Sequence, residues 1–413
     1  MLSGTRFCMA KFSTGCYIAL MQSGEIRKRF VEFFEKRGHA IVPSSSVVPD
    51  QSDSSVLFTT AGMQQFKPYY LGAASPYGNK ITTSQKCVRT SDIEEVGDER
   101  HLTFFEMLGN FSFGGYWKKE AISYAHEFVT KEMGLVIDYV TIFEGIKSSG
   151  GGFNNVPEDT ESANIWKSID PNLNIKKFGR DDNFWGPTGE AGPCGPTTEI
   201  YVNGIEIWNV VFNEYFKNKE GQFTKLDQTG IDTGMGLERL VMVMQKRDHV
   251  FETDLFTPMM SIIDSRVVVD HIRTSVFMIA DGVTPSNTDR GYILRRLLRR
   301  AYVYARSMGT ETEVLNAVVE AVINHQSYKG LYPFHEDTKK IIMEEIEKFK
   351  KALDLGLKQV EKGADPFILF TSYGLPLEII KEAIPSIDEE KFLRQMEEHK
   401  KTSQAAGEKK FSK

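Results

Sequence analysis

A two-residue break between two strand-like runs constrains this chain more than any other local feature. The runs 198–202 and 205–216 are rich in β-branched and aromatic residues, and Asn203-Gly204 separates them. Asn-Gly tolerates the positive φ angles of a tight hairpin turn, so the pattern predicts two antiparallel strands. Strand-like segments dominate from residue 56 to about residue 245, with helices predicted over Glu25–Arg37 and Glu120–Met133. This mixture favours an α+β fold with an antiparallel β-sheet flanked by helices.

The hydrophobic period changes after about residue 250, where apolar residues recur at helical spacing. The first predicted stripe contains Leu294, Leu297, Leu298, Ala301, Tyr304, Ala305 and Met308, and the second contains Ile342, Ile346, Phe349, Leu353 and Val360. We therefore expect a second, mostly helical domain. The predicted boundaries are a disordered N-terminal extension at 1–21, a sheet domain at 22–248, a helical domain at 249–400 and a polar tail at 401–413.

Composition limits the classes of partner and site. The formal net charge is -6, so nucleic-acid binding requires a local basic patch. No apolar run reaches the ~18 residues that a membrane span needs. The four cysteines, Cys8, Cys16, Cys87 and Cys194, form no CxxC pair. This spacing argues against a zinc site or a disulfide framework and favours a reducing compartment.

The first twenty residues leave two interpretations open. They contain Arg6 and Lys11 and no acidic residue, as transit peptides often do. The alternative is an upstream start codon, with Met21 as the functional start. We expect a cytoplasmic location, or a mitochondrial one if the extension is a transit peptide.

The segment from Cys87 to Phe113 has a composition suited to binding a nucleotide. Arg89 precedes a polar stretch that we expect to be a loop, and Arg100 follows it, shortly before Phe105. Arginine binds phosphate bidentately with a permanent charge, and an aromatic ring provides a stacking surface for adenine. By themselves, an arginine and a phenylalanine on adjacent strands are more often a salt bridge and a core residue.

A glycine-rich string at 230–240 supports the nucleotide interpretation. Gly234 and Gly236 allow close approach of the backbone to a ligand, and the following residues are predicted to begin a helix with Arg239 in or near its first turn. The alternative is a plain strand-to-helix turn. Two other residues have alternative roles. Cys194 in Gly-Pro-Cys-Gly-Pro is expected to serve tight packing rather than act as a nucleophile, and His101 to anchor the loop or contact phosphate rather than act as a base.

Several strings together resemble the class II aminoacyl-tRNA synthetases. The segment 89–113 resembles motif 2, the segment 234–239 resembles motif 3, and the segment 61–68 resembles the motif 1 region. The strings TFFEMLGNFSFG at 103–114, DTGMGLER at 232–239 and RGYILRRLLRRA at 290–301 are similar to the alanine-specific members in particular, as are DNFW, GPCGP and EIWNVVF. The resemblance extends from about Glu25 to the end of the chain.

The resemblance implies a catalytic domain at 22–248 that forms an aminoacyl-adenylate from ATP and L-alanine with Mg²⁺, without zinc, and transfers alanine to tRNA(Ala). Arg89, Asp232 and Arg239 would be catalytic, and the ATP-binding residues would be Arg89, Arg100, Phe105, Met107, Gly236 and Arg239. Trp185, Val211, Asp232 and Gly234 would bind alanine, with Asp232 at its ammonium group, and Glu199 and Asn209 are the candidates for Mg²⁺.

The helical domain would recognise the acceptor stem of the tRNA. The predicted helix after Arg290 carries Arg295, Arg296, Arg299, Arg300 and Arg306 opposite its apolar stripe. The alternatives are a solvated charged face and a face whose mutual repulsion is relieved by phosphate. The resemblance places Asn287 at a G·U pair, together with Arg290, Arg295, Arg299 and Glu378. Glu378 stands where the family has aspartate, in Tyr-Gly-Leu-Pro-Leu-Glu, and an acidic string at 91–95 replaces a basic motif 2 loop.

The resemblance also sets expectations for assembly and accuracy. The sequence ends where the family continues into editing and dimerising domains, so we expect a monomer that also charges serine and glycine without hydrolysing the products. Two alternatives remain: a paralogue that adenylates another small amino acid, and a non-catalytic RNA-binding scaffold. Loss of the arginine-rich helix would favour the paralogue, and loss of Arg89, Asp232 or Arg239 would favour the scaffold; all are present.

Overall fold

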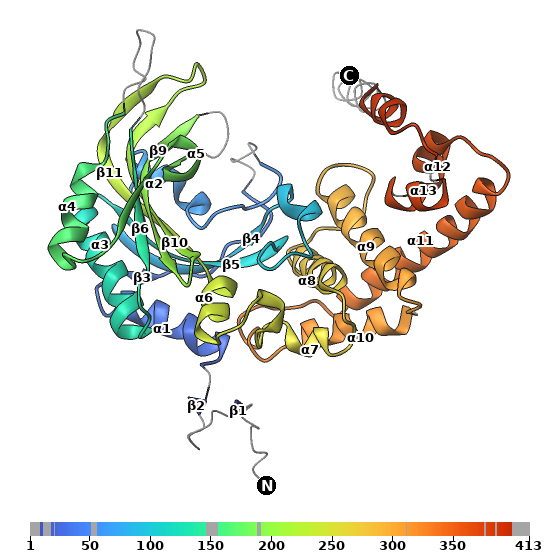
Figure 1. Cartoon of the computed structure of the whole chain (residues 1–413), viewed down its shortest axis with the longest axis horizontal. Helices are drawn as coiled ribbons and strands as arrows, with labels where there is room; N and C mark the ends of the chain where they lie inside the picture. The colour runs from blue at the N-terminus through green and yellow to red at the C-terminus, as the bar shows by residue number, and fades with distance from the viewer. Residues whose placement is uncertain are drawn as a thin grey trace.

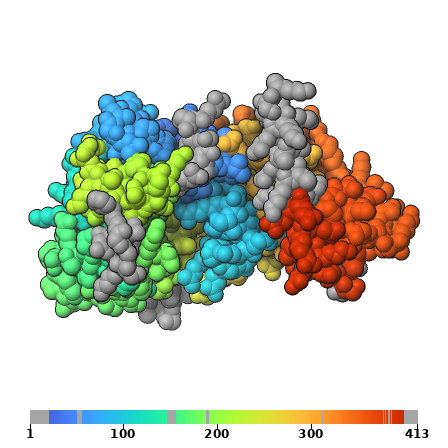
Figure 2. Space-filling model, turned by 90° about the horizontal axis from the view of Figure 1, so that it is seen from above, coloured from blue at the N-terminus to red at the C-terminus, as the bar shows by residue number. Residues whose placement is uncertain are grey.

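The computed structural model describes residues 9–10, 18–19, 21–50, 56–145, 156–187, 191–310, 312–375, 377–384 and 386–398. Most of the predicted extension at 1–21, and the tail at 401–413, lie outside these residues. A curved sheet occupies one side of the molecule, and helices that follow it in sequence occupy the other (Figure 1). Viewed from above, the blue to green sheet region and the orange to red helices lie on either side of a cyan segment near residue 100 (Figure 2).

The strands lie almost entirely in the first part of the described chain. They are β1 (Met9–Ala10), β2 (Ile18–Ala19), β3 (Ala40–Ile41), β4 (Lys80–Val88), β5 (Phe104–Phe113), β6 (Tyr139–Phe143), β7 (Ile175–Phe178), β8 (Phe184–Trp185), β9 (Gly192–Val202), β10 (Ile205–Lys217) and β11 (Phe223–Gly236).

Helices flank the sheet and make up every element after it. They are α1 (Ser23–Glu35), η1 (Gln64–Phe66), α2 (Lys67–Tyr70), η2 (Ser91–Glu94), α3 (Lys118–Glu127), η3 (Phe128–Glu132), α4 (Thr160–Ile169), α5 (Arg180–Asn183), α6 (Leu237–Met244), η4 (Val250–Glu252), α7 (Thr257–Met260), α8 (Arg266–Ala280), α9 (Asp289–Ser307), α10 (Thr312–Ile323), α11 (Thr338–Val360), α12 (Pro366–Tyr373) and α13 (Leu377–Ala383). The change from strands to helices near residue 250 agrees with the sequence pattern.

The main sheet has the order β3-β4-β5-β11-β10-β9-β6-β7, and β8 pairs with β9. The central pairs are antiparallel, as predicted, but β3 runs parallel to β4 and β6 runs parallel to β7. The predicted antiparallel sheet is therefore confirmed for the central strands, and the sequence did not predict the parallel pairs at its two edges. The predicted hairpin is present between β9 and β10, where Asn203 and Gly204 have φ of 53° and 72°.

The helix predictions differ from the structure mainly at their ends. The first helix begins at Ser23 and ends at Glu35, and Gly38 stops it with φ of 80°. The helix predicted over Glu120–Met133 is α3 continued by a turn of π-helix, η3. The predicted apolar stripe of α9 is buried except at Tyr304 and at Met308, which directly follows the helix; both are exposed.

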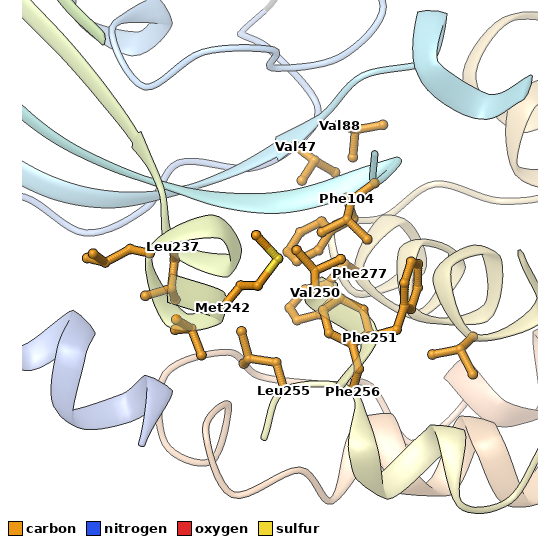
Figure 3. Close-up of a cluster of buried hydrophobic side chains, with 14 of the residues drawn as sticks. Val47, Val88, Phe104, Leu237, Met242, Val250, Phe251, Leu255, Phe256 and Phe277 are labelled. Atoms are coloured by element: carbon orange, nitrogen blue, oxygen red, sulfur yellow. The ribbon is translucent and has the colours of Figure 1, made fainter. Parts of the chain in front are cut away.

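One hydrophobic core joins the sheet to the later helices. Figure 3 shows side chains from β4, β5, α6, η4 and α8 meeting at this junction. The rings of Phe104 on β5 and Phe277 on α8 stack with centroids 3.9 Å apart and planes 8° apart. Since apolar burial on this scale is the main favourable term in folding, it fixes the helices against the sheet edge.

Two buried ion pairs lie within this core. Arg27 on α1 binds Glu106 on β5 with distances of 2.5 and 2.7 Å, and Arg273 on α8 binds Glu238 on α6 at 2.6 Å. The Glu238 carboxylate also accepts the Glu106 backbone N–H at 3.1 Å. Burial opposes ionisation of Glu106, but Arg27 holds the pKa of that carboxyl below its usual range. The two pairs therefore join α1, β5, α6 and α8 through charged groups.

We predict that Arg27→Met lowers the free energy of unfolding by about 3–5 kcal/mol, because Glu106 then stays buried without its cation. Arg29→Met on the same helix is the matched control. Arg29 is 38% exposed and pairs with Glu25 one turn away, so its loss costs less than about 1 kcal/mol. Urea unfolding followed by circular dichroism measures both, and equal shifts in the two variants would contradict the assignment.

Candidate active site

A cavity of about 420 Å³ opens on the concave face of the sheet, between β4–β5 and β9–β11. Its wall contains every residue predicted to bind ATP, alanine or magnesium: Arg89, Arg100, Phe105, Met107, Trp185, Glu199, Asn209, Val211, Asp232, Gly234, Gly236 and Arg239. These residues come from segments up to 150 positions apart, and the sheet order places them side by side.

The motif 2 segment forms one side of the cavity. Arg89 follows β4, and its guanidinium lies 5.0 Å from the centre of the Phe105 ring on β5. Arg89 Nε donates to the Thr60 carbonyl at 3.3 Å, and among the described residues its terminal N–H groups form no hydrogen bond that would compete with a ligand. In the loop between these strands, His101 contacts the carboxylates of Asp98 at 2.5 Å and Glu95 at 3.2 Å. These contacts agree with the expected anchoring role for His101.

Asp232 on β11 is one of three buried acids that line the cavity, with Glu199 and Glu238. It is 5% exposed, and burial alone raises its pKa to about 8. Among the described residues, no ion pair is recorded for its carboxylate. A buried carboxylate without a cation is costly, and a ligand ammonium would supply the missing charge.

Arg239 occupies the first turn of α6, as the glycine-rich string predicts. Its Nη1 donates to the Glu206 carboxylate at 2.9 Å and to the Glu206 carbonyl at 3.3 Å. The sequence did not single out Glu206. The pairing of β10 with β9 shifts register between Glu206 and Trp208, so simple alternation does not predict which face of the strand Glu206 occupies.

Glu199 and Asn209 lie next to each other on β9 and β10. Burial, and then the charges of Glu206 and Asp182, raise the pKa of Glu199 to about 7. Asn209 Nδ2 is 3.4 Å from a Glu199 oxygen, and the buried Asn209 Oδ1 has no recorded hydrogen-bond partner. Carboxylate and amide oxygens are the ligands that Mg²⁺ prefers. Crowded negative charge and an unused carbonyl oxygen therefore fit a cation, although no described group of three or more acidic, His or Cys side chains forms a complete metal cage.

Three side chains from different strands line the same cavity as Asp232. They are Trp185 on β8, Val211 on β10 and Met107 on β5, and Val211 is the cross-strand partner of Asp232. A Cβ added to Gly234 would lie 2.8 Å from the Met107 sulfur, so a larger residue there would displace the Met107 side chain. Cys194 is buried in a hydrophobic cluster with Phe184 and Tyr215, and burial raises its pKa to about 12, which favours the packing role over that of a nucleophile.

The arginine face of α9 differs from the sequence-based expectation. Phosphate is not required to relieve its repulsion, because each of the five arginines meets a carboxylate of this chain. Arg295 and Arg299 contact Glu345 at 2.8 and 3.5 Å, Arg306 contacts Asp354 at 2.7 Å, Arg300 contacts Glu94 at 2.8 Å, and Arg296 also contacts Glu94. The helix therefore presents a largely paired surface.

Two of the other residues predicted to bind RNA, Asn287 and Arg290, lie near the N-terminal end of α9. Asn287 is exposed, and its side-chain oxygen accepts from Arg295. Arg290 Nε donates to the Leu57 carbonyl at 2.5 Å. Glu378 lies in α13, and its side chain is outside the described residues. Among the helices that the structure describes, none has the length and hydropathy of a membrane span.

We predict that Asp232→Asn is more stable than the wild type at pH 8. Between about pH 4 and pH 8 the folded chain holds a proton on Asp232 that the unfolded chain releases, so Asp232 lowers stability as pH rises. The variant therefore has a flatter stability profile and gains at least about 1 kcal/mol at pH 8. Urea titrations at pH 5 and pH 8 test this, with the exposed Asp264→Asn as control. A loss of stability at pH 8 would overturn the electrostatic account.

Comparison with known proteins identifies the family of this chain. The family model described as tRNA synthetases class II (A) matches residues 25–413. The chain is 40% identical to the alanine–tRNA ligase of Carboxydothermus hydrogenoformans over 94% of this chain and 50% of that protein. It is 38% identical to the alanine–tRNA ligase of Borrelia hermsii over 95% of this chain and 74% of that protein. The chain thus spans half of the first relative and about three quarters of the second. This chain belongs to the class II tRNA synthetase family, among relatives that are alanine–tRNA ligases.

Proposed function

We propose that this chain activates L-alanine with ATP and transfers it to the 3′ end of tRNA(Ala). The observation that carries the proposal is the meeting of Arg89, Asp232 and Arg239 in one cavity. Two guanidinium groups there face an acidic group that has no recorded ion pair, which suits a nucleotide polyphosphate beside an ammonium ion.

The nucleotide would lie between β5 and α6. Phe105 offers one face for adenine, and Arg239 covers the opposite face and reaches the terminal phosphate after leaving Glu206. Arg89 binds the α-phosphate and the alanine carboxylate together, so the attacking oxygen is held in line with the α-phosphorus. Catalysis is then positioning and stabilisation of charge that develops on the phosphate, with no covalent intermediate on the enzyme.

Asp232 would bind the alanine ammonium in its ionised form. Because burial raises the pKa of Asp232 to about 8, alanine binding near neutral pH displaces a proton from this carboxyl. Trp185 and Val211 enclose the methyl group. The backbone at Gly234 lies against Met107, which places the amino acid beside the adenine pocket.

Glu199 and Asn209 would hold Mg²⁺. When bound, the ion would neutralise phosphate charge during displacement of pyrophosphate. Glu199 would be ionised by that ion despite its raised pKa, since a nearby cation favours the charged form of a carboxyl.

We predict that alanine supports faster ATP–pyrophosphate exchange than the other amino acids, with glycine about 10- to 200-fold slower because one methylene is worth little binding energy. Asp232→Asn lowers kcat/KM for alanine by about 10- to 100-fold, the value of one charged hydrogen bond. Asp264→Asn serves as the control and retains wild-type exchange. Faster exchange with another amino acid would favour the paralogue, and no exchange at all would favour the scaffold.

The acceptor stem would dock on the helical domain, with the reactive end directed to the cavity. Asn287 and Arg290 are the residues most available to it, since Arg295 and Arg299 are partly occupied by Glu345. Glu378 would contribute at the G·U pair. We further propose that the chain is a monomer in the cytoplasm.

We predict that Asn287→Ala lowers kcat/KM for tRNA charging by about tenfold, the value of about one hydrogen bond to a charged or base group, while pyrophosphate exchange stays unchanged. Asn324→Ala is the matched control, because Asn324 is an exposed asparagine that bonds only locally to the Glu320 carbonyl among recorded contacts. Equal charging by the Asn287 variant and the wild type would remove Asn287 from the RNA site.

A further inference from the structure

The loop between β4 and β5 is fastened to α9 by Glu94. This residue ends η2, and its carboxylate contacts Arg300 at 2.8 Å and also contacts Arg296. The sequence separation between Glu94 and Arg296 is 202 residues, so the contact joins distant parts of the chain. In Figure 1 the short cyan helix that precedes β5 lies close to α8 and α9.

Arg300 is held in place from behind. Its side chain is 6% exposed, and its Nε donates to His271 Nε2 at 3.3 Å. Because an arginine N–H can only donate, His271 accepts through Nε2 and directs its Nδ1–H to Asp270, 3.0 Å away. Both residues are fully buried on α8. This row of contacts fixes the direction in which the Arg300 guanidinium points.

The same loop carries residues of the cavity on either side of Glu94. Arg89 lies at its start, Asp92 lies two residues before Glu94, and Arg100 lies near its end; all three line the cavity. The Arg89 backbone N–H bonds to the Thr103 carbonyl at 2.9 Å, and the Thr103 N–H bonds to Asp270 at 2.9 Å. Asp270 therefore contributes both to the base of the loop and to the orientation of His271.

The loop is also rich in negative charge next to a site for an anion. Its acidic residues are Asp92, Glu94, Glu95, Asp98 and Glu99. Uncompensated, these carboxylates would repel a polyphosphate. His101 contacts Glu95 and Asp98, and the two arginines of α9 contact Glu94. The loop thus depends on the helical domain for part of its shape and its charge balance.

We propose that Glu94 and Arg300 are positioning residues for the nucleotide triphosphate. They touch no reacting atom. Together they hold the β4–β5 loop so that Arg89 and Arg100 face the cavity, and Arg300 acts from the helical region otherwise assigned to RNA. The inference rests on the proposed function for the identity of the nucleotide, but the fastening of the loop does not.

The test is Glu94→Gln in the full chain, compared with Asp354→Asn. Asp354 on α11 pairs at 2.7 Å with Arg306, which lies on α9 as Arg300 does, and Asp354 does not line the cavity. Its variant therefore breaks a similar ion pair of α9 that does not involve the loop. In pyrophosphate exchange, Glu94→Gln raises the KM for ATP about fivefold. The KM for alanine rises less, because alanine meets only Arg89 of this loop whereas the nucleotide meets both Arg89 and Arg100. Glu94→Asp restores part of the ATP affinity, and Asp354→Asn matches the wild type.

A second measurement needs no ligand and no activity. Hydrogen exchange read by mass spectrometry shows faster exchange at 89–101 in Glu94→Gln than in the wild type and in Asp354→Asn. Arg300→Lys, which keeps the charge but loses the fork that bridges His271 and Glu94, gives the same loop signature. If hydrogen exchange at 89–101 and the KM for ATP are both unchanged in Glu94→Gln, the inference is wrong. If the wild type lacks pyrophosphate exchange while the loop signature appears, the proposed function fails and the fastening stands.

Discussion

The contact between Glu106 and Glu238, at the wall of the cavity, is the constraint on which the rest of the structure depends. Two acidic residues meet in the core, and each needs its own arginine, Arg27 from α1 and Arg273 from α8. Glu238 also accepts the Glu106 N–H, which lies between Phe105 and Met107 on β5. Since Arg239 follows Glu238 directly, this arrangement sets the spacing between the two sides of the proposed adenine site. Buried charges of this kind are tolerated only when fully paired, so the geometry has little freedom.

Asp232, in the cavity, differs from these paired core acids. Asp232 is as buried as the core acids, yet no ion pair is recorded for it in the described part of the chain, and burial raises its pKa to about 8. Arg239 holds only a half-exposed acid, Glu206, which a phosphate can replace. Burying Asp232 without a cation therefore lowers stability until a ligand supplies a positive charge, whereas Arg27 and Arg273 supply that charge to Glu106 and Glu238 in the folded chain. This contrast distinguishes a binding site from a structural ion network in the same molecule.

The ion pairs of α9 change how its arginines are interpreted. Its arginines have the composition of an RNA-binding face, but Arg300 is buried and directed at the β4–β5 loop. The face divides into positions that remain near solvent, such as Arg290, and positions committed to the chain itself. The contacts of Arg296 and Arg300 with Glu94 connect the proposed RNA site directly to the loop beside the cavity. The stacked rings of Phe104 and Phe277 in the shared core support this connection.

The sequence by itself determined what local chemistry controls. The Asn203-Gly204 hairpin, the helix stop at Gly38 and the start of α6 after Gly236 follow from backbone preferences of a few adjacent residues. The strings around Arg89 and Asp232 identified the cavity residues because their resemblance to a family stands in for the fold. Only the tertiary structure decided which charges are paired. Glu345 lies 50 residues from Arg295, Glu206 lies 33 residues from Arg239, and the parallel edges β3 and β7 reflect crossovers that no local period encodes. The ion-pair partner and the burial of a residue depend on contacts between distant segments. The raised pKa of Asp232 and the contact of Glu94 with Arg300 therefore arise only in the folded chain.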